Sequence, residues 1–380
     1  MAELKNAAAI VGAALSDEMG KVPHKSSMQH HAEAAHNALK DAGLTKDDVD
    51  AVFTAGPGTL QLAEYLGIHP RFTDSTSVGG SSFVIHIGHA VSAIANGLID
   101  VALVTHGQAG QSSRGRAGGD PTAMGTQYES PYGFIGAPQN YALAGNRYMH
   151  EFGQERTRDA WAEIAMSTRK WAQLNPRAYQ RGDMTREDYD ASRWITYPFH
   201  LFDCCVVTDA GGAFVITSLD RARDLPKKPV KVLGFGEGHD HGIISQMPSV
   251  TSLIARETHK QAFDMAGITH DDLDLRMIYD SFTYTVLLTL EDLGFCGKGE
   301  GPDFIKSKTL GPGGDFAMNT SGGGLSYTHS GMYGMFLVVE AVTQLRGEAG
   351  DRQLDVCNTA LVHGTGGSLS SGGTTLLGID

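Results

Sequence analysis

The 380-residue chain has little cysteine and no long apolar run. Its cysteines, Cys204, Cys205, Cys296 and Cys357, form no CxxC pair and no metal-ligand spacing, which indicates reduced thiols and predicts no metal site in the chain. No apolar run reaches the roughly 18 residues that a membrane-spanning helix needs, and the N-terminal residues lack a secretory pattern. A cytoplasmic protein without a membrane span is expected.

The chain is also poor in positive charge. It has 30 Lys and Arg residues against 43 Asp and Glu residues, and its formal net charge is −13. Nucleic-acid-binding proteins normally present a basic face, so no binding to nucleic acid is expected. Apolar residues at 41% and charged residues at 19% are typical of a globular protein, and this length allows two or three core-forming units.

What the sequence does contain is an internal repeat. Residues 38–50 read ALKDAGLTKDDVD and residues 262–274 read AFDMAGITHDDLD, with the same spacing of Ala, Ala-Gly, Thr, Asp-Asp and Asp. Two further pairs follow in the same order, namely 76–83 with 320–327 and 102–107 with 360–364. Three collinear pairs predict one folding unit used twice, with a shared site where the two copies meet.

Strand and helix patterns alternate in the first unit. Short apolar runs at 7–14, 49–53 and 101–105 have the length of strands. Ser26 or Ser27 can cap a helix that Gly43 ends. A glycine-rich turn at 78–82 opens an apolar stretch that runs to Ala95. This alternation predicts an α/β fold with a mainly parallel sheet covered by helices.

The second unit follows the same plan. The expected strands are 230–234, 275–280, 359–363 and 374–377, and the expected helices are 252–266 and a stretch from Gly322–Gly324 to about Gly347. Residues 108 to about 205 match neither unit and are interpreted as a lid or substrate loop rather than core. The expected division is an N-terminal half at 1–107 and 206–225, an insert at 108–205, and a C-terminal half at 226–380.

The insert begins with a stretch rich in Gly, Ser, Arg, Tyr and Pro at 107–138 and continues with a polar helical stretch at 158–174. Its basic residues either meet an anionic ligand or form a solvated face. They are Arg114, Arg116, Arg169, Lys170, Arg177 and Arg181.

The end of the insert carries a family resemblance. Residues 197–205 read YPFHLFDCC and residues 208–213 read TDAGGA; these runs resemble the Pro-Asp-Cys strand and the DGAAA-like strand of the thiolase superfamily. Together with the duplicated halves, the whole chain resembles sterol-carrier-protein thiolases and their lipid-transfer-protein-like relatives. The resemblance implies the thiolase fold, in which two βαβαβαββ-type halves form a layered α-β-α-β-α arrangement with a large loop insert.

A thiolase places its nucleophilic cysteine at the start of the first glycine-rich helix. Gly97 and Asp100 resemble the family's G-x-x-D, and counting back from them puts Gly80 at the nucleophile position. The internal repeat agrees, because it pairs Gly80 with Gly324. Ser81 lies beside it, but a serine without an adjacent base is hardly ionised. The resemblance therefore leaves Gly80 as a backbone oxyanion donor and Ser81 as a substrate-binding residue.

The resemblance assigns three further elements to the same pocket. Residues 279–282 read YDSF, so Tyr279 replaces the first residue of an Asn-Glu-Ala-Phe or His-Asp-Cys-Phe motif. His329 is the histidine of a Gly-His-Pro motif, although Ser330 replaces the proline. Residues 363–367 read HGTGG and occupy the Cys-x-Gly element, with His363 in place of the acid/base cysteine. Both catalytic cysteines are absent, so acyl-enzyme chemistry of the thiolase type is not supported.

A retro-aldol cleavage of a β-hydroxyacyl-CoA needs no covalent intermediate, only a base and an oxyanion hole. Cysteine-less thiolase-like relatives include retro-aldolases that shorten steroid side chains together with a small zinc-ribbon/OB-fold partner. The implied catalytic residues are Tyr279 or Tyr327 as the base, His329 as the enolate stabiliser and His363 as an aid to protonation. The other implied site residues are Gly80 and Gly366 as backbone donors, with Ser81 and Phe282 against the substrate.

Two other functions stay open. One is a non-catalytic acyl-CoA or sterol carrier, and the other is an acyltransferase with an unorthodox nucleophile, for which Cys296 in the loop 294–297 is a candidate. The substrate is expected to be a CoA thioester with a steroid or aromatic acyl group, no cofactor is expected, and zinc is expected only in the partner. The resemblance also implies a homodimer through the sheet edge of the first half, joined by partner chains into a heterotetramer.

Overall fold

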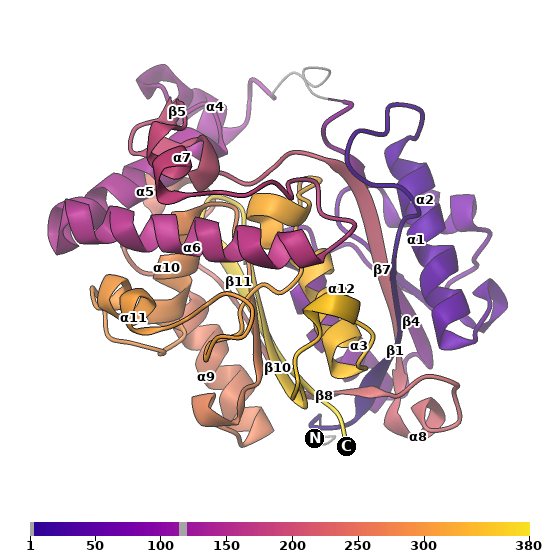
Figure 1. The fold of residues 1–380 in the computed structure, drawn as a ribbon. Coiled ribbons are helices and arrows are strands. Elements are labelled where there is room, and N and C mark those ends of the chain that lie inside the picture. Colours follow the sequence, from indigo (N-terminus) through magenta and orange to yellow (C-terminus); the bar gives the residue numbers. More distant parts are fainter. Residues whose placement is uncertain (1–3, 114–119) are drawn as a thin grey trace.

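A computed structural model describes residues 4–113 and 120–380 (Figure 1). Its centre is a nine-stranded sheet in the order β3-β2-β4-β7-β1-β8-β11-β10-β9. The strands of the first half are β1 Ala8–Leu15, β2 Ala51–Phe53, β3 Phe72–Asp74, β4 Val101–Ala109 and β7 Asp209–Ser218. Those of the second half are β8 Val230–His239, β9 Leu275–Ile278, β10 Thr359–Gly366 and β11 Ser371–Gly378.

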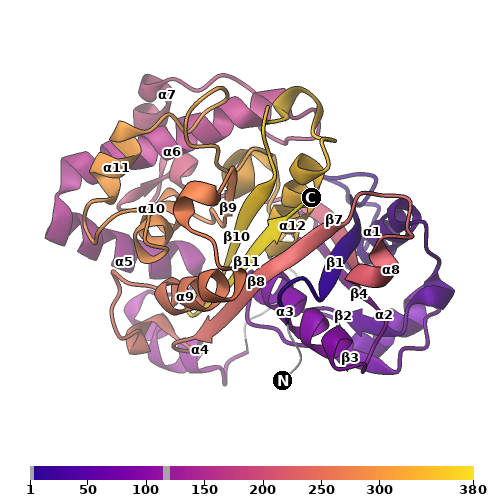
Figure 2. The same ribbon diagram turned by 90° about the horizontal axis from the view of Figure 1, so that it is seen from below.

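The helices divide this sheet into layers. Those outside the insert are, in chain order, α1 Ser27–Ala42, α2 Thr59–Leu66, α3 Ser82–Ala95, α8 Leu219–Ala222, α9 Ala255–Ala266, α10 Thr283–Asp292, α11 Gly301–Ser307 and α12 Gly334–Leu345. Helices α3 and α12 pack in the central apolar cluster between the two halves of the sheet, while α1 and α9 belong to separate outer clusters. Figure 2 shows the two halves side by side, joined where β1 pairs with β8. The expected α-β-α-β-α layering of the thiolase fold is confirmed.

The expectation of a mainly parallel sheet is wrong. Parallel pairing occurs between β2 and β3, β2 and β4, and β9 and β10. The pairs β1–β7, β1–β8, β4–β7, β8–β11 and β10–β11 are antiparallel. In the second half β11 follows β10 through a short turn, and in the first half β7 returns beside β4 after the insert; both returns give antiparallel pairing.

Local capping explains why the repeated segments fold alike. Ser26 caps α1, because its hydroxyl accepts a hydrogen bond from the Gln29 backbone N–H. Helices α1 and α9 end at Gly43 and Gly267, which have φ of 70° and 67° and occupy the left-handed region that glycine adopts without strain. The short helical turns that follow begin at Thr45 and Thr269, each with the same capping box.

The helix expected to open at Gly322–Gly324 is not formed. Residues Gly323–Tyr327 make one π-helical turn, a loop follows at 328–333, and α12 begins only at Gly334. The buried carboxylate of Asp280 accepts hydrogen bonds from the backbone N–H groups of Gly324 and Leu325, at 2.6 and 3.1 Å. These contacts hold the turn apart from the helix. Gly80 and Gly324 are therefore not structural counterparts, because α3 begins at Ser82 and its partner α12 at Gly334.

The insert contributes both core and cavity wall. It contains α4 Met124–Tyr128, α5 Ala137–Phe152, α6 Gln154–Leu174, α7 Arg186–Ala191 and a small sheet of β5 Trp194–Thr196 and β6 Phe199–His200. Tyr148 and Trp161 are fully buried in the outer cluster of the second half, so the expectation of a lid without core is corrected.

Within the described ranges no helix, α6 included, is long and apolar enough to cross a membrane.

Candidate active site

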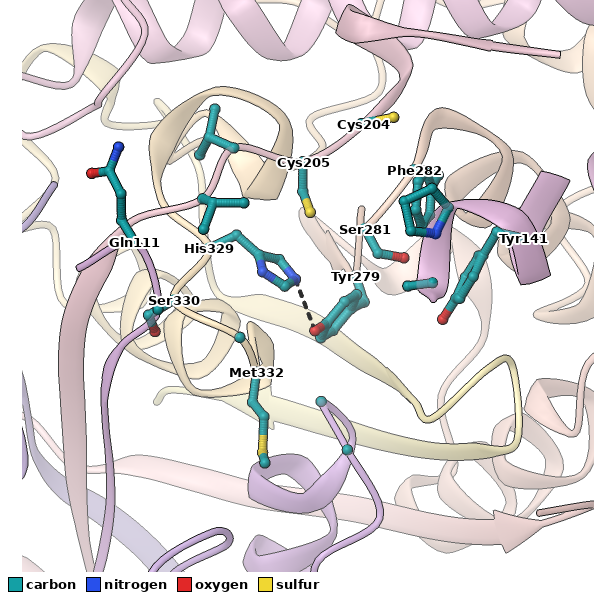
Figure 3. A pocket seen from close by; sticks show the side chains of 18 of the residues that line it. Gln111, Tyr141, Cys204, Cys205, Tyr279, Ser281, Phe282, His329, Ser330 and Met332 are labelled. Carbon is teal, nitrogen blue, oxygen red and sulfur yellow. Dashed lines mark hydrogen bonds between the residues drawn. The ribbon is translucent and has the colours of Figure 1, made fainter. Parts of the chain in front are cut away.

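A cavity of about 720 Å³ lies where the two halves meet the insert (Figure 3). The turn before α3, the end of β9, the loop before α12 and the end of β10 all contribute to its wall. The lining residues from these segments include Gly79, Gly80, Tyr279, Ser281, Phe282, His329, Ser330, Gly331, Met332, Thr365 and Gly367. The insert and the segment after it add Tyr141, Arg193, Leu201, Cys204, Cys205, Val206 and Val207.

Tyr279 stands at the centre of this wall. Its hydroxyl accepts a hydrogen bond from the backbone N–H of Tyr333 at 3.0 Å and lies 3.1 Å from Nε2 of His329, the contact drawn as a dashed line in Figure 3. Burial raises the pKa of Tyr279 well above its usual value. The resting side chain is therefore a neutral phenol that can donate its own proton.

His329 is the partner that can take this proton. Burial lowers the pKa of His329 to about 4, and its own backbone carbonyl opposes this shift weakly. The ring is neutral at pH 7. We assign its proton to Nδ1, the nitrogen near that carbonyl, so that Nε2 accepts from the Tyr279 hydroxyl. Thr208 holds the residue from both sides, because its hydroxyl accepts the His329 N–H at 3.0 Å and its N–H donates to the His329 carbonyl at 3.2 Å.

Gly80 and Tyr279 depend on each other. A Cβ atom at position 80 would lie 2.1 Å from Cε2 of Tyr279 and 2.4 Å from its hydroxyl oxygen. The phenol thus occupies the space that any side chain at position 80, a cysteine included, would need. The absence of a nucleophile at position 80 and the presence of Tyr279 beside it are therefore coupled.

Of the residues expected in the site, Gly80, Tyr279, Phe282 and His329 line the cavity, but His363 does not. Its Nδ1 is 2.8 Å from the Thr374 hydroxyl within the sheet, and burial lowers its pKa to about 3. The cause is strand length, because β10 continues to Gly366 instead of ending at His363. Thr365 and Gly367 line the cavity in place of His363 and Gly366.

Two more expected residues face elsewhere. Tyr327 is buried beside Phe336 and borders a separate cavity of about 110 Å³, because the π-helical turn directs it into the central core. Ser81 is fully buried, and its hydroxyl lies 2.8 Å from that of Ser371. Neither side chain lines the main cavity.

The cysteines divide between the cavity and the periphery. Cys296 is half-buried outside the cavity, and burial raises its pKa to about 12. Cys204 and Cys205 line the cavity instead, and the Cys205 sulfur lies near Tyr279 and His329 in Figure 3. Burial raises the pKa of Cys204, so its thiol is not activated. Residues 197–205 carried the family resemblance, but no local signal placed these thiols in the pocket.

None of the expected basic residues that the structure describes lines the cavity. Arg169 donates to the Ser326 hydroxyl and the Gly182 carbonyl, Arg181 donates to the Gln173 carbonyl, Arg177 donates to the Ser16 carbonyl and Lys170 is exposed. Arg114 and Arg116 lie outside the described residues. Arg193, which sequence reasoning missed, is exposed and lines the cavity.

Among the described residues no cluster of three or more His, Cys, Asp or Glu side chains can hold a metal ion.

Comparisons with known proteins agree with this geometry. Residues 236–379 match the family model "Thiolase C-terminal domain-like". The chain is 35% identical to a steroid side-chain-cleaving aldolase of Thermomonospora curvata and 35% identical to a 17-hydroxy-3-oxo-4-pregnene-20-carboxyl-CoA lyase of Mycobacterium tuberculosis, in each case over 96% of this chain and 97% of the relative. The solved "Ltp2-ChsH2(DUF35) aldolase" superposes with a TM-score of 0.90 at 32% identity, covering 100% of this chain and 99% of that one. The protein therefore belongs to the thiolase superfamily, in its branch of sterol-carrier-protein-thiolase-like retro-aldolases.

Proposed function

We propose that the protein cleaves a β-hydroxyacyl-CoA by a retro-aldol reaction into a ketone or aldehyde and a shorter acyl-CoA. The observation that carries this proposal is the hydrogen-bonded pair of Tyr279 and His329, in a cavity where the Tyr279 ring fills the space that a nucleophile at position 80 would need. The named activities of the two 35% identical relatives support it and favour a steroid side chain as the acyl group.

The first step is proton removal from the β-hydroxyl group. Tyr279 Oη takes this proton while its own proton passes to Nε2 of His329, along the 3.1 Å hydrogen bond. The bond between Cα and Cβ then breaks, so that the β-carbon becomes a carbonyl carbon and the bonding electron pair forms the thioester enolate. The Tyr333 N–H stabilises negative charge on the phenol oxygen during this transfer.

The second step returns the proton. His329 gives it back through Tyr279 to Cα of the enolate, which becomes the short acyl-CoA, and the enzyme regains its resting state. In this arrangement His329 is a proton acceptor and not the enolate stabiliser implied by the resemblance. We assign the stabilisation of the enolate oxygen to backbone N–H groups in the turn before α3 and at Gly367. These residues border the cavity beside Tyr279.

Arg193 is the basic residue we assign to the CoA end of the substrate. It lines the cavity and is exposed, which places it at the cavity edge, and no carboxylate lies within ion-pair distance in the described ranges. An unpaired guanidinium suits the planar, doubly hydrogen-bonded recognition of a phosphate.

The proposal includes a homodimer and a partner chain. Strand β3 is an edge of the sheet and pairs with β2 on one side, so its other side can pair with a second copy. The name of the solved Ltp2-ChsH2(DUF35) aldolase joins two components, which favours a partner chain, and we propose a small zinc-ribbon/OB-fold protein as the partner here. Cys204, Cys296 and Cys357 form no disulfide, and this together with a CoA substrate favours the cytoplasm.

The test is incubation with a β-hydroxyacyl-CoA, with and without the partner, followed by detection of ketone and short acyl-CoA. Tyr279→Phe should lower kcat by about 10² to 10⁴-fold and leave KM nearly unchanged, because the phenyl ring still fills its space. Tyr327→Phe is the comparison that separates the two tyrosines and should have a much smaller effect. Unchanged turnover in Tyr279→Phe would remove Tyr279 from the mechanism. Binding without product would favour a carrier, and a covalent acyl adduct would favour an acyltransferase.

A further inference from the structure

The loop at 328–333 carries both groups that hold the Tyr279 hydroxyl, namely the His329 ring and the Tyr333 N–H. It is also tied to β4, because the Ser330 hydroxyl lies 2.9 Å from Nε2 of His106. We propose that His106 is a positioning residue for the Tyr279–His329 pair and acts through Ser330. This inference rests on the proposed function, because it concerns the same reaction.

Among the residues that the structure describes, the His106 side chain makes one hydrogen bond and otherwise packs against aromatic rings. Its ring is buried against Phe83 and Phe336, with centroids 4.9 and 5.9 Å away. Burial holds its pKa well below the usual value, so the ring is neutral. Within the described ranges its Nδ1 has no hydrogen-bond partner. A buried polar atom without a partner destabilises the folded state, so a phenyl ring would suit this packing better. The hydrogen bond to Ser330 is what the imidazole adds.

A second buried serine–histidine pair shows what differs here. The Ser16 hydroxyl lies 3.3 Å from His30, but it also donates to the Glu18 carbonyl and accepts from the Gly211 N–H, each at 3.0 Å. Ser16 is therefore held without its histidine. In the described part of the chain the Ser330 hydroxyl has no side-chain contact of this kind besides His106, so its orientation depends on that ring.

The consequence is catalytic because Ser330 follows His329 directly. A shift of the loop lengthens the hydrogen bond between Tyr279 and His329, along which the proton moves. A displacement of about 1 Å in a catalytic arrangement can cost on the order of 10²-fold in rate. His106 therefore acts on kcat and has no contact with the substrate.

Two substitutions at one position separate this role from simple packing. His106→Phe keeps the ring contacts and loses the hydrogen bond, whereas His106→Gln loses the ring and places an amide nitrogen near the site of Nε2. We expect His106→Phe to lower kcat by about 10 to 100-fold with KM nearly unchanged, and His106→Gln to stay within about threefold. A packing role predicts the opposite order.

Ser330→Ala should match His106→Phe, and the double variant should lose no more than either alone, since both remove one interaction. Ser16→Ala, the matched control, should lower the melting temperature without changing kcat. Losses that multiply in the double variant would overturn the proposal. So would a His106→Phe enzyme at least as fast as His106→Gln.

A readout without turnover separates the inference from the proposed function. In ¹⁵N-histidine-labelled protein, Nε2 of His329 should give the signal of an unprotonated, hydrogen-bonded nitrogen. His106→Phe and Ser330→Ala should move this signal towards a mixture of tautomers, and His106→Gln should preserve it. If the wild-type protein cleaves no substrate but this pattern appears, the proposed function fails and the positioning role stands. An unchanged His329 signal in His106→Phe would overturn the positioning role.

Discussion

The two halves of the protein share their outer elements and differ at the entry to their central helices. Helices α1 and α9 both end at a left-handed glycine and lead into a threonine-capped turn. Helix α3 begins directly after the turn at Gly79 and Gly80, whereas α12 begins after a π-helical turn and the loop at 328–333.

The residues of the candidate active site lie in the segments where the two halves differ. The short entry leaves an empty space at Gly80, and the phenol of Tyr279 fills it. The long entry brings the His329 ring and the Tyr333 N–H to the same hydroxyl. The repeated elements form the frame, and the site is built from the segments in which the halves are unlike.

After the loss of Tyr279 itself, the largest effect is expected from filling the space beside it. In Gly80→Ala the new Cβ would lie 2.1 Å from the Tyr279 ring, so the phenol must move away from His329. Turnover should fall by about 10²-fold, measured as kcat with a β-hydroxyacyl-CoA. Gly182→Ala, where a Cβ meets nothing within 4 Å, is the control. Full activity in Gly80→Ala would contradict the coupling of positions 80 and 279.

Acid should destabilise both halves together. Burial lowers the pKa of His31 and His363 to about 3 and that of His86 and His329 to about 4, from 6.5. Below pH 6.5 the unfolded chain binds protons that the folded chain does not. Each such group therefore lowers the free energy of unfolding by up to about 1.4 kcal/mol per pH unit.

Three groups oppose this trend. Burial raises the pKa of Asp280 to about 7 and also raises that of Asp203, and the hydrogen bond to Asp74 raises the pKa of His89. The folded state therefore binds extra protons at these groups as the pH falls, but the histidines with lowered pKa outnumber them. Urea titrations at pH 7, 6 and 5 should show one cooperative transition with a falling midpoint. A midpoint that is constant or rises would contradict this prediction, and two separate transitions would show that the halves unfold independently.

A smaller effect is expected in the insert, which has no counterpart in the second half. Arg193→Gln should raise KM for the acyl-CoA by about tenfold, the equivalent of about 1.4 kcal/mol, and leave kcat nearly unchanged. The rise should shrink for a substrate analogue that lacks the CoA phosphates. An equal rise for both substrates would mean that Arg193 does not contact the phosphates.

The smallest effects should be equal in the two halves. The Thr45 hydroxyl donates to Asp48 at 3.0 Å, and the Thr269 hydroxyl donates to Asp272 at 2.9 Å. Thr45→Ala and Thr269→Ala should each lower the free energy of unfolding by about 0.5–1 kcal/mol, measured by urea denaturation. Unequal losses would show that the repeated turns contribute differently to stability.

The repeated frame could be predicted because its signals are local. Ser26 as a cap, Gly43 as a helix end and the apolar strand periods act over a few residues, and the structure contains each of them. The missing nucleophile could also be predicted, since Gly80 has no side chain whatever its surroundings. Sheet direction, the start of α12 and the orientation of His363 could not, because each depends on a contact outside the run of residues that carried its signal.

The sequence by itself determined that one folding unit is used twice and that no thiol stands at the start of α3, since both facts are properties of residue type and spacing. Only the tertiary structure decided that Tyr279 takes the empty place beside Gly80 and that His329, rather than His363 or Tyr327, is the side chain it meets. The physical reason is that these contacts join residues far apart in the chain, and the Asp280-bound turn between them sets which side chains face the cavity.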